Sequence, residues 1–377
     1  MNAYVKANSF VSPVTDAKEV ELATSKALAV LKDLEENPAK ATVLNRVTRD
    51  LTTSKGDEAQ YAFSILPHAA AEINRLPDDR VADYLFHRYR YDVFPLSREL
   101  DDYPPCLQIE PASICNFRCV FCYQTDQALT LKKNGHMGFM DLDLLKRVVD
   151  QAEGKVEIVT LASRGEPTLH PKFTELMDYL RGKFLSLKIN TNASRLTEEK
   201  CHAILQADVS TLVFSADAAS EPLYSSMRVN GKLEQTLGNV ETFRRIREKD
   251  YPKSRIITRV SGVKYAEEQS LEEMEKAWGG LVDQVVFVDY NPWENSYERS
   301  PTSVNSPCSD LWRRMFVWWD GIANPCDVDY LSTLRSGRLQ DSSLSDLWTG
   351  AAYSQLRESH IRSEREKIEP CRRCSVT

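Results

Sequence analysis

The sequence lacks several features that mark whole classes of protein. No apolar run in its 377 residues reaches the roughly 18 residues that a membrane-spanning helix needs. The first 26 residues are polar and contain no apolar core of a secretory signal. With 14 Gly and 17 Pro, the chain is too poor in both for a collagenous or low-complexity protein. We therefore expect a globular, cytoplasmic protein with no membrane partner.

A basic excess is also missing. Lys and Arg number 48 against 55 Asp and Glu, which gives a net charge of −7. Proteins that bind nucleic acid through its phosphates usually carry a basic excess or a basic stripe. The run RRIREK at 244–249 is most simply a solvated helix face. We expect no nucleic-acid partner.

Cysteine is the informative residue type. Nine cysteines, an odd number, argue against a secreted disulfide framework. Two stand alone, at Cys106 and Cys201, and the other seven form two groups. In a reducing compartment such groups more often bind metal or carry out redox chemistry.

The chain changes character at Tyr103. Residues 1–102 have the apolar spacing of helices, for example over 19–36 and 60–76. Short β-rich runs then alternate with helical stretches at 141–153, 173–184, 197–206 and 237–249. The predicted strands are 106–111, 156–162, 185–190, 211–216, 256–263 and 283–290. This alternation predicts an α/β fold, a partial (β/α)6 TIM-like barrel with functional residues at the carboxyl ends of its strands.

A polar, turn-rich linker at 291–307 separates the last 70 residues. These contain a predicted hairpin at 318–326 and a predicted helix at 344–360. We expect three parts: an N-terminal helical region (1–102), the partial barrel (103–295) and a small C-terminal α+β cluster-binding domain (296–377).

The first cysteine group has the spacing C-x3-C-x2-C, formed by Cys115, Cys119 and Cys122 just after the first predicted strand. Thiolates suit zinc or an iron–sulfur cluster. Three cysteines leave one coordination position without a protein ligand, and a catalytic site needs such an open position for the molecule that reacts. The alternative is a zinc site that borrows a fourth ligand such as His136.

This loop resembles that of the radical S-adenosylmethionine (SAM) enzymes. The resemblance implies that the three cysteines hold a [4Fe–4S] cluster whose fourth iron binds the amino and carboxylate groups of SAM. One electron then splits SAM, and the 5′-deoxyadenosyl radical abstracts a hydrogen atom from a C–H bond. The aromatic Phe121 and Tyr123 also match the family.

Further segments resemble the family's SAM-binding motifs. Residues 164–167 are similar to its GGEP motif, but Arg164 replaces the first glycine and is expected to pair with a carboxylate or phosphate. The resemblance assigns SAM binding to Tyr123, Gly165, Glu166, Asn192, Ser215, Asp217 and Arg228. The alternatives are an exposed loop acid for Glu166, a turn for Asn192 and a helix-surface arginine for Arg228.

The second cysteine group comprises Cys308, Cys326, Cys371 and Cys374. Four thiolates suit a zinc ion or a fully ligated [4Fe–4S] cluster. With residues such as Trp312 and 346–348, this region resembles the SPASM domain in its shorter twitch form. The resemblance implies one auxiliary [4Fe–4S] cluster, which has no free iron for substrate and is suited to electron transfer.

Three other residues are candidates for catalysis. Cys106 or Cys201 could donate a hydrogen atom to a substrate radical, although a small buried residue is the alternative for both. Arg259 lies on the fifth predicted strand, where it would face the barrel lumen. Residues 289–295 supply polar and aromatic groups that would face substrate or pack against the C-terminal domain.

These observations favour a radical SAM oxidoreductase or epimerase that acts at a carbinol carbon of a small polar molecule, such as a sugar, nucleotide-sugar or aminocyclitol. A single auxiliary cluster resembles that of an aminocyclitol dehydrogenase, and residues 1–102 do not resemble the winged-helix domain that holds peptide leaders.

A flavodoxin or ferredoxin would supply electrons. The alternative is a maturase that crosslinks or epimerises a ribosomal peptide or protein side chain. A remote alternative is an inactive, zinc-stabilised binding protein.

Overall fold

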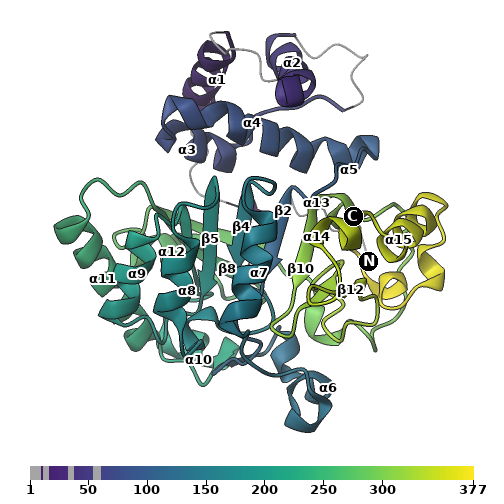
Figure 1. Cartoon of the computed structure of the whole chain (residues 1–377). Coiled ribbons are helices and arrows are strands. Elements are labelled where there is room, and N and C mark those ends of the chain that lie inside the picture. Colours follow the sequence, from purple (N-terminus) through teal and green to yellow (C-terminus); the bar gives the residue numbers. More distant parts are fainter. Residues whose placement is uncertain (1–9, 12–16, 33–37, 54–60) are drawn as a thin grey trace.

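A computed structural model describes residues 10–11, 17–32, 38–53 and 61–377. A twisted sheet forms its centre, with helices packed on its outer face (Figure 1). The N-terminal helices lie across one end of the strands, and the C-terminal region lies beside one edge of the sheet. Residues 33–36 of the first predicted helix fall outside the described residues.

The six predicted strands form one parallel array in chain order, which confirms the α/β fold and the partial barrel. They are β2 (Cys106–Ile109), β4 (Ile158–Leu161), β5 (Ser186–Thr191), β6 (Thr211–Ser215), β8 (Ile257–Lys264) and β9 (Gln284–Asp289). Because the strands are parallel, their carboxyl ends meet at one edge, which places the loops after β2, β4, β5 and β6 together.

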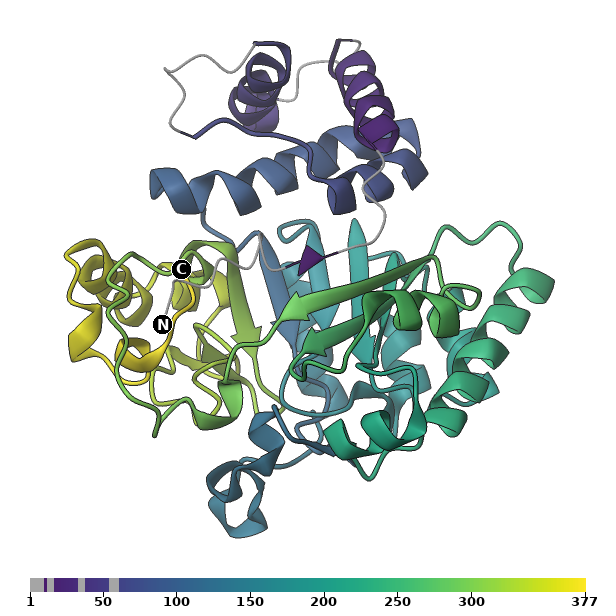
Figure 2. The ribbon, with the colours of Figure 1, turned by 180° about the vertical axis from the view of Figure 1, so that it is seen from behind.

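The sheet extends beyond these six strands at both edges. On one edge β1 (Phe10–Val11) runs antiparallel to β9 (Figure 2). On the other, β10 (Arg314–Val317) runs parallel to β2 and continues into β11 (Ile322–Asn324) and β12 (Gly337–Arg338). A hairpin is present, β10–β11, but it spans 314–324, so its first strand precedes the predicted range of 318–326. This C-terminal hairpin belongs to the same sheet as the barrel strands. The predicted limits between the barrel (103–295) and the C-terminal domain (296–377) therefore remain a prediction.

The outer layer consists of crossover helices. Four occupy predicted positions: α7 (Leu142–Ala152), α8 (Phe173–Leu180), α9 (Glu198–Gln206) and α11 (Leu233–Asp250). In α7, Asp141 caps the first turn, and Leu145, Val148 and Val149 face the sheet. Three helices of residues 103–295 were not predicted: α6 (Gln127–Thr130), α10 (Glu221–Met227) and α12 (Leu271–Trp278).

The N-terminal helices close the end of the barrel where the strands begin. They are α1 (Ala17–Lys32), α2 (Pro38–Thr52), α3 (Pro67–Arg75), α4 (Asp78–Asp92) and α5 (Phe94–Ser97). Their apolar cluster includes Cys106 and Ile158 from the sheet. Arg90 of α4 also pairs with Glu157 at 2.8 Å. Apolar and ionic contacts therefore both hold these helices against the barrel.

The C-terminal region contains α13 (Asp310–Arg313), α14 (Leu344–Thr349) and α15 (Ala351–Ile361). The single helix predicted over 344–360 is thus two helices, because Gly350 adopts an extended conformation between them. Two single turns of 3-10 helix follow, η5 (Arg365–Lys367) and η6 (Cys371–Arg373). Among the described residues, no helix combines the length and apolar character that a bilayer span requires.

Candidate active site

The first cysteine loop follows β2 and is fixed by a short two-stranded ladder. Within it, β3 (Arg118–Cys119) pairs antiparallel with β7 (Arg228–Val229), so that Cys119 lies opposite Arg228. Cys115, Cys119 and Cys122 all belong to one apolar cluster built around Phe117, Phe121 and Met227. The loop therefore brings the three predicted cluster ligands to one place.

Each of these sulfurs faces an N–H donor. Phe117 N donates to Cys115 Sγ at 3.4 Å, Gln124 N to Cys122 Sγ at 3.5 Å, and Arg228 Nη1 to Cys119 Sγ at 3.6 Å. Burial raises the pKa of the Cys115 thiol to about 12. Such donors would stabilise thiolates once iron is bound, and hydrogen bonds to sulfur tune cluster potentials. The donor set therefore fits an iron–sulfur cluster.

Glu166 connects the loops after β4 and β5. Its buried carboxylate accepts hydrogen bonds from Thr168 N (3.0 Å), Thr191 Oγ1 (2.7 Å) and Asn192 N (2.7 Å). Asn192 in turn donates from Nδ2 to Asn116 Oδ1 of the cysteine loop at 3.1 Å. Glu166 and Asn192, which the resemblance assigns to SAM binding, therefore belong to one hydrogen-bond network that reaches the cysteine loop.

A second buried carboxylate, Asp217, follows β6 and pairs with Arg228. Asp217 Oδ1 also accepts from Val263 N at 2.7 Å. Burial opposes the charge of Arg228, but Asp217 and Cys119 together raise its pKa above the usual value. The pair is neutral overall, but it holds a permanently charged guanidinium beside the cysteine loop, with Nη1 directed at Cys119 Sγ.

A cavity of about 280 Å³ opens beside this loop, at the carboxyl ends of the strands. We call it the upper cavity because this end is the top of a barrel by convention, although it faces down in Figure 1. Five of the residues that line it are Cys119, Cys122, Tyr123, Ser215 and Arg228. The lining also includes Asn190, Ser261, Asp289, Asn291 and Trp293. The segment after the sixth strand therefore does face this cavity. Four residues that the resemblance assigns to SAM are not among its lining residues: Gly165, Glu166, Asn192 and Asp217.

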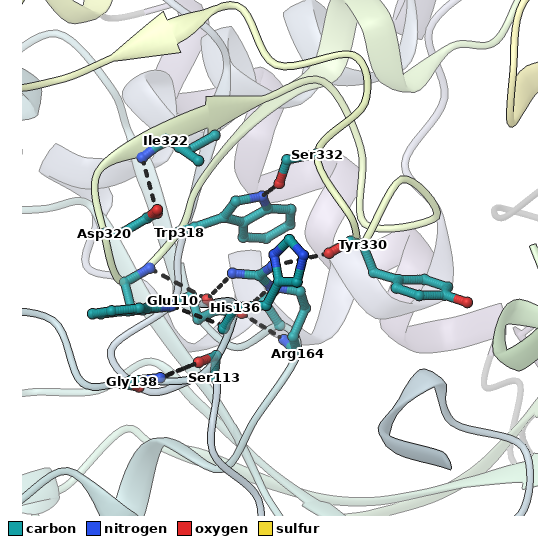
Figure 3. Close-up of polar contacts among 12 residues, drawn as sticks. Glu110, Ser113, His136, Gly138, Arg164, Trp318, Asp320, Ile322, Tyr330 and Ser332 are labelled. Carbon is teal, nitrogen blue, oxygen red and sulfur yellow. Dashed lines mark hydrogen bonds and ion pairs between the residues drawn. The ribbon is translucent and has the colours of Figure 1, made fainter. Parts of the chain in front are cut away.

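Arg164 and Glu110 form a bidentate buried ion pair at the same edge of the sheet (Figure 3). Arg164 Nε and Nη2 lie 2.8 and 2.6 Å from the two Glu110 oxygens. Arg164 Nη1 also donates to Tyr330 O at 2.9 Å, and its guanidinium lies 4.3 Å from the ring centre of Trp318. The expected carboxylate partner of Arg164 is thus Glu110, and the pair joins the barrel to the C-terminal region.

Sequence reasoning missed Glu110, Trp318 and Tyr330 as parts of this arrangement. An acid directly after a buried strand is a usable signal for Glu110. Nothing in the sequence indicates that Trp318 and Tyr330 contact Arg164, which lies more than 150 positions earlier in the chain. His136, the alternative zinc ligand, lies beside Arg164 in Figure 3, and its carbonyl accepts from Trp319 Nε1 at 2.9 Å.

The second cysteine group also gathers at one place. Cys308, Cys326, Cys371 and Cys374 all line one small, largely apolar cavity. The buried Arg365 donates to Cys371 O at 3.0 Å and to Cys374 O at 2.6 Å. Its charge would offset that of an anionic cluster. Across the described ranges, no three His, Cys, Asp or Glu side chains are arranged to hold a single metal ion.

The three catalytic candidates lie outside the upper cavity. Cys106 and Arg259 line a second cavity at the opposite end of the barrel. Cys201 is fully buried in α9, within the apolar core between helices and sheet, and burial raises its pKa to about 12. A hydrogen donor must touch the substrate radical, so the structure does not support Cys201 in this role.

Models of two known protein families match this chain, and each covers one of the two cysteine groups. A model of the radical SAM superfamily matches residues 109–276, and a model of the SPASM iron–sulfur cluster-binding domain matches residues 308–375.

Two curated relatives share part of the chain. One relative is the tungsten-containing aldehyde ferredoxin oxidoreductase cofactor-modifying protein of Pyrococcus furiosus. The two chains are 30% identical over 113 residues, which cover 29% of this chain and 30% of that protein. This chain is 27% identical over 136 residues to the mycofactocin maturase of Mycobacterium tuberculosis, covering 36% and 33%. The chain thus spans about a third of the length of these relatives.

Solved structures show the same fold. BtrN in complex with AdoMet and 2-DOIA superposes with a TM-score of 0.50 at 17% identity, covering 73% of this chain and 94% of BtrN. SuiB of Streptococcus suis bound to its precursor peptide SuiA gives 0.50 at 16% identity, covering 93% and 86%.

Proposed function

Because the chain belongs to the radical SAM superfamily and carries a SPASM domain, we propose that it is an oxidoreductase or epimerase acting on a small polar molecule. These two domains imply a SAM-binding [4Fe–4S] cluster and an auxiliary cluster. With SAM bound, the first cluster supplies the electron that generates a 5′-deoxyadenosyl radical, which abstracts hydrogen from the substrate.

In this proposal the two cysteine groups have separate tasks. Cys115, Cys119 and Cys122 hold the cluster that binds SAM, because their loop opens directly onto the upper cavity. Cys308, Cys326, Cys371 and Cys374 hold the auxiliary cluster. The Asp217–Arg228 pair orients the SAM carboxylate, and the Glu166 network fixes the loops around the SAM amino group.

The polar lining of the upper cavity supports the substrate assignment. Beside the residues assigned to the cluster and SAM, Asn190, Ser261 and Asn291 offer amide and hydroxyl groups to a hydroxylated ligand. The described part of residues 1–102 forms helices plus the two-residue β1, which supports a small molecule over a peptide leader.

Asp289 is the proposed base. It lies at the carboxyl end of β9 and is the carboxylate that lines the upper cavity among the described residues. In an oxidation, one hydrogen would leave the carbinol carbon as an atom and the hydroxyl proton would pass to a base, while the remaining electron would pass to the auxiliary cluster, which leaves a ketone. The Asp289 carboxylate would accept that proton.

The experiment is turnover of reconstituted holoenzyme with a reductant, SAM and pools of sugars, nucleotide-sugars and aminocyclitols. We expect one pool to stimulate 5′-deoxyadenosine formation and to give a ketone or an epimer. Asp289→Asn should keep SAM cleavage while losing at least about 100-fold in ketone formation, the scale of a lost general base. Equal ketone formation by Asp289→Asn would rule out this base.

Specific observations favour a second candidate, a peptide maturase. The mycofactocin maturase is among the relatives, and SuiB bound to its precursor peptide shares the fold over 93% of this chain. Stimulation of 5′-deoxyadenosine formation by a peptide, with no response to any small-molecule pool, would favour this candidate.

A further inference from the structure

The cavity between the four cysteines of the second group, here called the auxiliary cavity, has a mainly apolar lining. Beside the cysteines, leucine, valine and proline residues line it together with three polar side chains, those of Asp310, His360 and Arg365. All three are buried, at 2%, 1% and 1% exposure. A buried polar atom needs a hydrogen-bond partner, because burial without one costs free energy. The partners of these three side chains therefore show what the cavity accommodates.

Two of the three side chains find their partners within the protein. Arg365 donates from Nε to Cys371 O (3.0 Å), from Nη1 to Ser306 O (3.1 Å) and from Nη2 to Cys374 O (2.6 Å). The carboxylate of Asp310 lies 3.6 Å from Arg314 Nε. Arg365 thus ties together the segments that carry Cys308, Cys371 and Cys374.

His360 is the third polar side chain, and only one of its two ring nitrogens has a partner. Its Nδ1 accepts a hydrogen bond from Cys308 N at 3.2 Å. Because a backbone N–H can only donate, Nδ1 carries no proton and the ring proton is on Nε2. Nε2 is buried and has no hydrogen-bond partner among the described residues. The ring therefore brings an unused N–H donor to the wall of the auxiliary cavity.

The helix that carries His360 is firmly held in the C-terminal region. His360 belongs to the last turn of α15, which Figure 1 shows at the outer side of this region. Arg357, one turn earlier, donates to Leu311 O and to Trp348 O, both at 2.9 Å. Tyr353 Oη donates to Asn324 O at 3.1 Å. These contacts fix α15, so the imidazole stays beside Cys308.

A cluster bound in the auxiliary cavity would supply the missing acceptor. The sulfur atoms of iron–sulfur clusters accept hydrogen bonds from the protein. Cys374 Sγ already receives one from Val376 N at 3.4 Å. We propose that His360 donates a hydrogen bond from Nε2 to a sulfur atom of the auxiliary cluster. This inference rests on the auxiliary cluster of the proposed function and deepens it, because it assigns a residue that tunes that cluster.

Such a hydrogen bond would raise the reduction potential of the auxiliary cluster. The reduced cluster carries one more negative charge than the oxidised cluster, so a donor at sulfur stabilises the reduced form more. In the oxidation proposed above, one electron passes from the substrate to the auxiliary cluster after the hydrogen atom and the proton have left. A higher potential favours that transfer.

The test is a redox titration of the reconstituted holoprotein, followed by EPR at the cluster signal that SAM does not perturb. His360→Asn places an amide oxygen near the position of Nδ1, which keeps an acceptor for Cys308 N and removes the donor. At a fixed potential, the ratio of oxidised to reduced auxiliary cluster should rise about tenfold in His360→Asn, which is a fall of about 59 mV in midpoint potential.

Two further variants serve as controls. His360→Gln brings an amide N–H near the position of Nε2 and should restore most of the difference. Gln355→Asn, on the exposed side of α15, should leave the potential at the wild-type value.

A second measurement needs no variant to fold. Pulsed EPR of the reduced wild-type protein, labelled with ¹⁵N-histidine, should show a coupling of the auxiliary cluster to a histidine nitrogen, and the labelled His360→Gln protein should lack it. If His360→Asn takes up no auxiliary iron, this measurement decides.

Two results would overturn the inference: no histidine coupling in the wild type, or a wild-type potential in His360→Asn with its full iron content. Iron content separates this inference from the proposed function. About four irons per chain instead of eight would refute the auxiliary cluster and with it the proposed function, whereas eight irons without the coupling would refute the role of His360 alone.

Discussion

At the scale of single residues, the cysteines divide the molecule into two cluster sites that should fail independently. Cys115→Ala removes a ligand of the SAM-binding cluster, so it should abolish SAM cleavage. Cys326→Ala should leave the first cluster in place and lose iron from the auxiliary site. Iron content and 5′-deoxyadenosine formation, measured on both reconstituted variants, check this. Cleavage that survives in Cys115→Ala would contradict the assignment.

The Arg164–Glu110 pair gives a second prediction at this scale. Glu110→Gln leaves the buried guanidinium without its carboxylate, which should cost about 3–5 kcal/mol in the free energy of unfolding. The matched control is Asp178→Asn, because Asp178 pairs with Arg181 on the surface, where such a pair contributes about 0–1 kcal/mol. Urea denaturation measures both. A loss below about 1 kcal/mol for Glu110→Gln would show that the pair is not structural.

At the scale of elements, the loop after β4 must pack directly on the cysteine loop. A Cβ added at Gly165 would overlap the backbone of Ala112, Ser113 and Ile114. Gly165→Ala should therefore displace the cysteine loop and lower iron occupancy of the first cluster, whereas a side chain at Gly238 in α11 meets nothing within 4 Å. Gly238→Ala should stabilise the helix by up to about 1 kcal/mol. Equal iron content in both variants would contradict this packing.

The seam between α3, α4 and the barrel should be sensitive to acid. Burial and Arg88 lower the pKa of His68 to about 3, with Lys188 and Arg259 acting in the same direction and Glu72 against it. The unfolded chain takes up this proton near pH 6.5 and the folded chain does not, so stability falls as the pH drops from about 6.5 toward 3. The slope is about 1.4 kcal/mol per pH unit.

His68→Gln removes this proton uptake. Between pH 7.5 and pH 5, the wild type should therefore lose about 2 kcal/mol more stability than His68→Gln does. Chemical denaturation at the two pH values checks this. Parallel losses in the two proteins would show that His68 titrates normally.

The elements also show what a sequence can predict. The strands were predictable because each is a short apolar run that follows a turn, and five neighbouring pairs are parallel as strand–helix alternation requires. Helix α12 was missed although Ser270 caps it by accepting from Glu273 N, a Ser-x-x-Glu pattern that marks a helix start. The break at Gly350 was missed because the apolar spacing continues across it.

At the scale of the whole molecule, the barrel contains two cavities, one beside the cysteine loop and one at the opposite end, under α4. The cysteine motifs were readable in sequence because the ligands of the first group are close together. The cavity under α4 could not be predicted, because α4 and β10 contribute Arg88 and Arg314 to it from positions more than 200 residues apart. Only the tertiary fold brings such charges to one cavity.

The central claim is that this chain holds two [4Fe–4S] clusters and binds SAM at one of them. The most direct test is iron and sulfide content, with EPR spectra of the anaerobically reduced protein recorded with and without SAM. The account predicts about eight irons per chain, from two four-iron clusters, and a signal that SAM perturbs. A protein that takes up no iron after reconstitution, or whose cluster signal does not respond to SAM, would contradict it.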